Sequence, residues 1–228
     1  MKNIAKSILL VSGIVVTLLF TGTVLGYASN NEDGNGTHEN PIAVVSQQPG
    51  FCSIFRSWGF IGDSLCSGEH EYHKSDGSKG YADLYEYSWG QFICYATGAK
   101  GDNYSQGGET ARGWIEHFWN NPKNRNNNID AKAEPKQAYI IALGVNDTYK
   151  KHPVGNVESD INKDDYTQNA QTYTGCYAGI IQRIQSIQPD AKIFVVTRPK
   201  EESTNEAYNE VVRRMSDIFE NVYVIDLY

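Results

Sequence analysis

The sequence predicts an α/β fold in which helices cover both faces of a parallel sheet. Short apolar runs alternate with longer amphipathic segments, and this alternation is typical of strand–helix–strand units. Two of the apolar runs, residues 58–61 and 139–143, lead directly into polar turns. In parallel sheets such turns follow the carboxyl ends of strands, where α/β proteins place their functional residues.

The pattern predicts about five strands connected by helices. We expect strands at residues 57–61, 102–105, 137–143, 191–197 and 222–227. We expect helices directly after Ser64 and at residues 80–98, 111–119, 166–187 and 204–219, with polar loops at 120–128 and 149–165. The spacing of the aromatic residues in 80–98 predicts that they face the core. Pro189 ends the helix expected at 166–187.

The first 28 residues have the pattern of an export signal. Lys2 and Lys6 precede an apolar stretch at 8–26, and Gly26 and Ala28 supply the small residues of a cleavage site. The stretch approaches the roughly 20 residues of a spanning helix, so an uncleaved membrane anchor is the alternative. Either way we expect the rest of the chain outside the cytoplasm, secreted or held at the membrane by this helix alone.

The segment that follows, residues 29–50, is polar and glycine-rich, which predicts a flexible linker. The globular domain is expected to span residues 51–228. A formal net charge of −7 and a pI near 5.2 argue against binding to nucleic acid, because no basic surface offsets phosphate charge.

The four cysteines leave two interpretations open. Cys52, Cys66, Cys94 and Cys176 allow three disulfide pairings in an exported protein, and buried free thiols are the alternative. Their spacing lacks the Cys-x-x-Cys pattern of a zinc site. Cys66 lies two residues after Ser64, but no motif supports it as a nucleophile.

Three short motifs at or just beyond expected strand ends carry the chemistry. They are Gly-Asp-Ser-Leu at 62–65, Gly-Gly-Glu-Thr at 107–110 and Gly-Val-Asn-Asp at 144–147. Together they offer a serine nucleophile, backbone N–H donors and a side-chain amide donor, which are the parts of an acyl-transfer site. Each motif alone is also an ordinary turn, flexible loop or helix cap. Their combination in this order favours a catalytic site.

The three motifs resemble those of the SGNH hydrolases, the GDSL esterase/lipase family, over roughly residues 51–228. The resemblance implies a flavodoxin-like, three-layer α/β/α fold and ester hydrolysis through an acyl-enzyme, with no metal or organic cofactor. It implies Ser64 as nucleophile and a backbone donor to the oxyanion, joined by Gly108 (Gly107 is the alternative) and the amide of Asn146. Asp63 and Asp147 are expected to support these residues.

One block of the family, an Asp-x-x-His that supplies the base and its orienting carboxylate, has no counterpart after the last expected strand. The histidines of the sequence are His38, His70, His73, His117 and His152. We interpret His70 and His73 as surface residues, while His152 could line a substrate cleft. Asp226 lies at the edge of the last strand and receives no role. We therefore expect the domain to be incomplete at its C-terminal end, with the base histidine beyond residue 228.

The substrate is less well defined than the chemistry. Carbohydrate O-acyl or acetyl esters are favoured over lipids, because nothing after the leader resembles an apolar lid or a lipid-surface helix. Tyr72, Tyr81, Tyr85, Trp89 and Trp114 could stack on sugar rings, although aromatics at helical spacing are more often core. Two other functions stay open. One is a non-catalytic ligand- or glycan-binding relative, and the other, weaker one is a metal-dependent phosphoesterase using Asp63, Asp147 and histidines.

Overall fold

The computed structural model describes residues 50–122, 129–200 and 206–228. The predicted leader, nearly all of the linker and most of the polar loop at 120–128 lie outside the described residues. Among the residues that are described, none belongs to a helix with the length and apolar character needed to cross a membrane.

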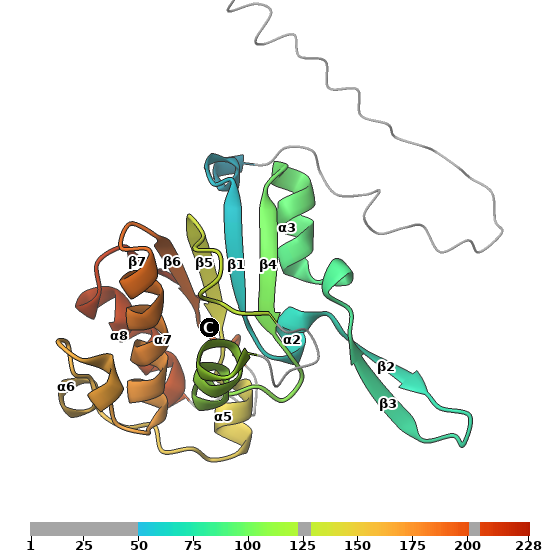
Figure 1. Cartoon of the computed structure of the whole chain (residues 1–228). Coiled ribbons are helices and arrows are strands. Elements are labelled where there is room, and N and C mark those ends of the chain that lie inside the picture. The colour runs from blue at the N-terminus through green and yellow to red at the C-terminus, as the bar shows by residue number, and fades with distance from the viewer. Residues whose placement is uncertain (1–49, 123–128, 201–205) are drawn as a thin grey trace, which may run out of the picture. The chain divides into compact units, whose positions relative to one another are not determined.

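The core of the molecule is a sheet of five parallel strands in the order β4-β1-β5-β6-β7 (Figure 1). The strands are β1 (Ser57–Gly62), β4 (Lys100–Ser105), β5 (Ala138–Ala142), β6 (Lys192–Val196) and β7 (Val222–Ile225). The predicted parallel sheet of about five strands and the α/β/α class are therefore confirmed. Strand β1 is the first strand of this sheet in the sequence. The next, β4, pairs with one edge of β1, and β5 pairs with its other edge. The strand order thus reverses at β1, where open α/β sheets bind their ligands.

The three strands around this reversal end in register. Gly62 of β1 lies opposite Ser105 of β4 and Ala142 of β5. Since parallel strands share one carboxyl edge, the residues that follow these three positions leave the sheet side by side. The fold therefore brings the three sequence motifs to one edge.

One face of the sheet packs against α4 (Ala111–Trp114), α7 (Tyr173–Ile187) and α8 (Glu206–Ile218). Inward-facing strand residues such as Ile61, Ile141 and Val195 are fully buried there. The helices contribute a closely packed set of large side chains: Trp114, Phe118, Tyr173, Tyr177, Ile180, Ile181 and Met215. Each such side chain contributes on the order of 1.5–3 kcal/mol by leaving water, so this face supplies most of the hydrophobic stabilisation.

The other face is covered by α3 (Trp89–Thr97), over β1 and β4. Trp58 and Phe60 of β1 are buried under it, and Gly90 of α3 meets the Phe60 ring so closely that a Cβ there would lie 2.6 Å from the ring. Over β6 and β7 the cover is thinner within the described residues. Phe194 and Val196 are only partly buried, and Ile225 is 38% exposed.

The expected helix at 80–98 is wrong over its first half. Residues Lys79–Asp83 form strand β3, which pairs antiparallel with β2 (Glu69–His73) in a hairpin, and Tyr85–Tyr87 form a short 3-10 turn. The α-helix begins only at Trp89, because Ser88 has extended backbone angles and its side chain accepts a hydrogen bond from Gln91 N. A serine in this position ends the preceding segment and caps the helix.

The expected helix at 166–187 begins later than predicted, for a similar reason. Thr172 is extended, and its hydroxyl accepts a hydrogen bond from Gly175 N at 3.2 Å, so α7 starts at Tyr173. Residues Tyr166–Gln168 form a separate 3-10 turn. The helix predicted at 111–119 is continuous, but after α4 it widens into the π-type turn η4 (Ile115–Asn120). The expected loop at 149–165 contains the short helix α6 (Val157–Asp160).

The cysteines are free thiols, which settles the alternative left open by the sequence. Cys66, Cys94 and Cys176 are buried, and Cys52 is exposed. Burial raises the pKa of the Cys66 thiol to about 12, so the thiol stays protonated and unreactive near neutral pH.

Candidate functional site

The first motif forms a sharp turn from β1 into the single-turn helix α2 (Ser64–Ser67). Gly62 permits this turn, because a Cβ there would lie 2.3 Å from the Cβ of Cys66. Asp63 caps α2, and its Oδ1 accepts a hydrogen bond from Leu65 N at 3.0 Å. Ser64 is therefore the first helical residue and is partly exposed at the carboxyl edge of the sheet.

The second motif follows β4 and is tied to the first by Asp83, a residue that sequence reasoning did not single out. The Asp83 carboxylate accepts hydrogen bonds from Ser67 Oγ in α2 and from Gly107 N at 3.2 Å. Gly108 has a left-handed φ of +74°, which favours glycine, and it is exposed. Its N–H has no acceptor among the described residues, whereas the N–H of Gly107 is occupied.

The third motif follows β5 and begins helix α5 (Val145–Tyr149). Asn146 Nδ2 donates to Glu109 O at 3.0 Å, and the buried Asp147 accepts from Ala111 N at 3.1 Å through Oδ2. The first contact reaches the second motif, and the other reaches the first residue of α4, directly after that motif. The third motif is thereby fixed against the second.

These contacts place the predicted donors on one edge of the sheet. Ser64 and Gly108 offer backbone N–H groups without an acceptor in the described part of the chain, and the amide of Asn146 uses one bond on Glu109 O. Lys150 adds a further link, since its Nζ donates to Gly108 O at 2.9 Å. The edge is therefore suited to receiving an oxygen that carries negative charge.

The described histidines lie in two settings. His70 and His73 are exposed on β2, as expected for surface residues. His117 Nδ1 lies 2.9 Å from Glu109 Oε2, and His152 Nδ1 lies 3.0 Å from Asp147 Oδ1.

No described histidine is hydrogen-bonded to the Ser64 hydroxyl. His152, which the sequence allowed as a cleft residue, lines a small cavity of about 80 Å³ and lies against the carboxylate of Asp147, which accepts a hydrogen bond from Ala111 N. In the described ranges no three His, Cys, Asp or Glu side chains are grouped as a metal site would need.

Asp63 combines burial with an incomplete set of hydrogen bonds. Its side chain is 1% exposed, and Oδ2 has no hydrogen-bond partner within the described residues. Burial, above all, raises the pKa of this carboxyl to about 6, and the nearby Asp147 adds to the rise. Burial also raises the pKa of Asp147, against the hydrogen bonds from His152 and Ala111 that favour its ionised form. Ionised Asp63 is thus costly to the folded state.

We expect Asp63→Asn to stabilise the protein near pH 7.5 and to have little effect near pH 4. Asparagine keeps the cap to Leu65 N but carries no charge. Asp63 titrates near 6 when folded and near its ordinary 3.8 when unfolded. Between these two values the folded protein keeps a proton on Asp63 that the unfolded chain has lost. The free energy of unfolding of the unaltered protein therefore falls as pH rises through this range. This difference in pKa corresponds to about 3 kcal/mol, which is the increase in the free energy of unfolding expected for Asp63→Asn above pH 6.

The check is the free energy of unfolding by urea at pH 4 and pH 7.5. The matched control is Asp76→Asn, because Asp76 is exposed and hydrogen bonds from Ser78 lower its pKa. An equal effect of Asp63→Asn at both pH values would contradict the prediction, because it would show that the Asp63 carboxyl of the unaltered protein has the same pKa in the folded and unfolded chains.

An apolar cavity of about 590 Å³ lies beside the first motif. Leu65, the residue after Ser64, forms part of its wall together with Trp89 of α3. Cys66 of α2 and Ile93 of α3 also line it, and the other lining residues come from β5, β6 and β7 and the segments after them, among them Leu143, Val145, Val196, Ile225 and Leu227. The cavity thus occupies the thinly covered region of the α3 face, next to the candidate site.

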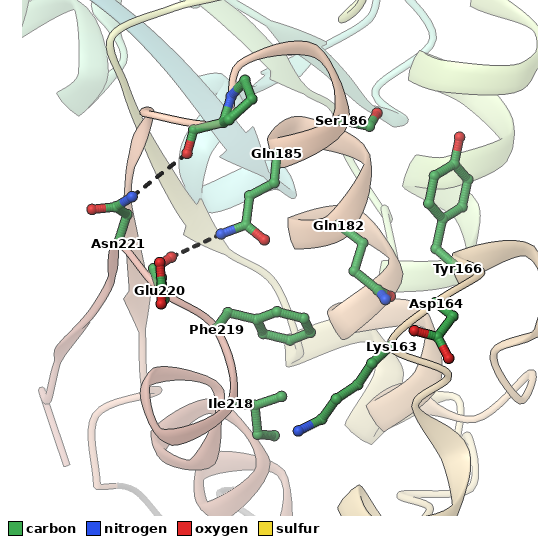
Figure 2. Close-up of a pocket in the computed structure, with 11 residues that line it drawn as sticks. Lys163, Asp164, Tyr166, Gln182, Gln185, Ser186, Ile218, Phe219, Glu220 and Asn221 are labelled. Carbon is green, nitrogen blue, oxygen red and sulfur yellow. Dashed lines mark hydrogen bonds between the residues drawn. The ribbon is translucent and has the colours of Figure 1, made fainter.

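A second cavity, of about 570 Å³, is shown in Figure 2. Its walls are the C-terminal half of α7, the 163–166 segment and the turn between α8 and β7. Gln185 Nε2 donates to Glu220 O at 2.8 Å, which ties α7 to that turn. Asn221 directly precedes β7, so this cavity sits at the amino edge of the sheet, opposite Ser64. It is not part of the candidate site.

Comparison with known proteins agrees with this geometry. A model of the GDSL-like lipase/acylhydrolase family matches residues 60–228. No curated protein sequence matches the chain.

The fold is similar to several solved structures. A protein from Bacteroides uniformis described as a GDSL-like lipase is 16% identical, with a TM-score of 0.51 over 76% of this chain and 83% of its own. A family two carbohydrate esterase from Clostridium thermocellum, in complex with cellohexaose, is 17% identical, with a TM-score of 0.51 over 75% of this chain. The chain spans 53% of that esterase. At such identities the likeness establishes the fold.

Proposed function

Because the chain belongs to the GDSL-like lipase/acylhydrolase family, we propose that it is a serine esterase with Ser64 as nucleophile. One observation carries the proposal. The turns after β1, β4 and β5 are joined at the carboxyl edge of the sheet by hydrogen bonds of Asp83, Asn146 and Asp147. A serine hydroxyl and three donors then share one edge, as acyl transfer requires.

In the proposed reaction, Ser64 Oγ attacks the carbonyl carbon of an ester and its proton passes to a general base. The negative charge that develops on the carbonyl oxygen is received by the N–H groups of Ser64 and Gly108 and by the amide of Asn146. The C–O bond to the leaving alcohol then breaks, and the alcohol takes the proton. Water, activated by the same base, releases the acyl group from Ser64.

We assign the general base to none of the described histidines, because none of them is hydrogen-bonded to the Ser64 hydroxyl. Strand β7 ends at the same edge of the sheet as β1, so the residues after β7 lie on the side of the sheet where a base for Ser64 is needed. Asp226 does not serve as the orienting carboxylate in this proposal. It binds Arg213 Nε at 2.9 Å and Thr197 Oγ1 at 2.8 Å, which hold it as a structural residue.

For the substrate we favour an O-acyl ester of a carbohydrate, processed outside the cytoplasm. The carbohydrate esterases that share the fold support this choice. Of the aromatic residues considered for stacking on sugars, Trp114 is fully buried and belongs to the core. Tyr72 is exposed but its ring packs over Gly80, whereas Tyr81 is exposed and remains a candidate for stacking. The apolar cavity beside Leu65 is the observation that favours the lipid-ester alternative.

The experiment that tests the proposal is labelling with a fluorophosphonate, which phosphonylates an activated serine. We expect one adduct on the full-length protein, and peptide mass mapping should place it on Ser64. Pretreatment with a chelator is the control, since a metal-dependent phosphoesterase would lose its activity while a serine esterase would not.

A different outcome would favour the second candidate, a ligand-binding relative that does not hydrolyse esters. The specific observation behind it is that no described histidine is hydrogen-bonded to the Ser64 hydroxyl. Absence of any adduct on the full-length protein, at a fluorophosphonate concentration that labels a known serine esterase, would contradict the enzyme and support the binding protein.

A further inference from the structure

The hairpin β2–β3 directly follows α2, the helix that begins with Ser64, and projects from the sheet (Figure 1). Its strands pair in a strict register, with Glu69 opposite Asp83, Glu71 opposite Tyr81 and His73 opposite Lys79. Successive residues of a strand point to opposite faces. These three pairs therefore share one face, and the pair Tyr72 and Gly80 lies on the other.

The first of these faces continues into the candidate site. At its base, Asp83 accepts the hydrogen bonds from Gly107 N and from Ser67 of α2. Glu69 lies against the same glycine, since a Cβ on Gly107 would be 2.1 Å from Glu69 Oε2. The root of the hairpin face is thus in contact with the Gly107–Gly108 turn, and the rest of the face leads away from it.

The middle of this face holds an aromatic ring in a fixed position. Tyr81 is 57% exposed, and its hydroxyl donates to Glu71 Oε2 at 3.2 Å. Lys79 Nζ lies 2.9 Å from Glu71 Oε1, so the carboxylate is held between the two side chains. A large exposed ring that is already ordered loses little conformational entropy on binding.

We infer that the hairpin face of Glu71, Lys79 and Tyr81 binds the sugar chain of the substrate and guides it toward the Gly107–Gly108 turn. This inference rests on the proposed esterase function and adds the surface that would recognise the alcohol part of the ester.

The chemistry of the face fits an uncharged polysaccharide. Sugar rings present C–H groups that pack on an aromatic ring, and hydroxyls that pair with carboxylate and ammonium groups. Glu71 and Lys79 neutralise each other, so this part of the face favours neither an anionic nor a cationic partner. Tyr81 is two residues from Asp83, about 7 Å along an antiparallel strand, which places the ring within a short saccharide of the turn.

The test is binding of cellohexaose and of acetylated xylan fragments to the full chain by titration calorimetry, in a Ser64→Ala background that prevents turnover. We expect Tyr81→Ala to weaken binding about tenfold, the loss of one stacking contact. Tyr72→Ala is the matched control. It removes the same side chain from the same hairpin, but from the opposite face, where the Tyr72 ring packs over Gly80.

Equal weakening by the two substitutions, no effect of Tyr81→Ala, or no binding of either saccharide would overturn the inference. Tyr81→Phe separates stacking from hydrogen bonding, and it should retain most of the affinity because it keeps the ring. Circular dichroism and the melting temperature of each variant show that the fold is intact. Failure of saccharide binding can be told apart from failure of the proposed esterase function, because fluorophosphonate labelling tests the esterase without any saccharide.

Discussion

Replacing Ser64 with alanine is expected to reduce hydrolysis of p-nitrophenyl acetate to the uncatalysed background and to abolish fluorophosphonate labelling. In a serine hydrolase with a complete triad, loss of the nucleophile costs on the order of 10⁶-fold in kcat. The structure adds a second expectation. The Ser64 hydroxyl has no hydrogen-bond partner among the described residues, so the substitution should change the free energy of unfolding by no more than about 0.5 kcal/mol.

Loss of activity without loss of stability separates a nucleophile from a structural serine. Ser53→Ala is the control, because Ser53 precedes β1 at the amino edge of the sheet and its hydroxyl donates to Gly50 O. It should leave both hydrolysis and labelling unchanged. Residual hydrolysis by Ser64→Ala at the rate of the unaltered protein would remove Ser64 from the mechanism.

The strands could be predicted where burial dictates the sequence. Residues 58–61 and 139–143 are apolar because both faces of the central strands are covered, and β1 and β5 are found there. The hairpin at 69–83 could not be predicted in the same way. All five residues of β2 are exposed, so no apolar alternation marks the strand, and backbone pairing with β3 determines its structure. Helix starts were missed where a cap interrupts apolar spacing that continues upstream, at Ser88 and Thr172.

The candidate site could be predicted as a set of residues but not as a set of contacts. Ser64, Gly108 and Asn146 stand in motifs whose order is informative. Asp83 was missed because it acts 24 residues away from Gly107, on the unpredicted hairpin. Asp147 reaches Ala111, 36 residues distant, and only the register of the parallel strands brings the two together. Pairings of this kind depend on the tertiary fold, and local sequence carries no signal for them.

Replacing Asn146 with alanine is expected to lower kcat by about 10²–10³-fold while changing KM little, because the amide stabilises charge that appears only in the transition state. The side chain also donates to Glu109 O at 3.0 Å, so a stability cost of about 1 kcal/mol should accompany the loss. Asn146→Asp should be at least as damaging, since a carboxylate offers acceptors where both Glu109 O and the oxyanion need donors.

Because Asn146→Ala is expected to lower stability as well as activity, it needs a control variant that lowers stability alone. Asn156 caps α6 and accepts a hydrogen bond from Glu158 N at 2.8 Å, in a loop away from the three motifs. Asn156→Ala should therefore cost about 1 kcal/mol of stability with kcat unchanged. If Asn146→Ala lost no more activity than Asn156→Ala, its effect would be one of stability alone. The oxyanion would then have to be held by the N–H groups of Ser64 and Gly108 without the amide.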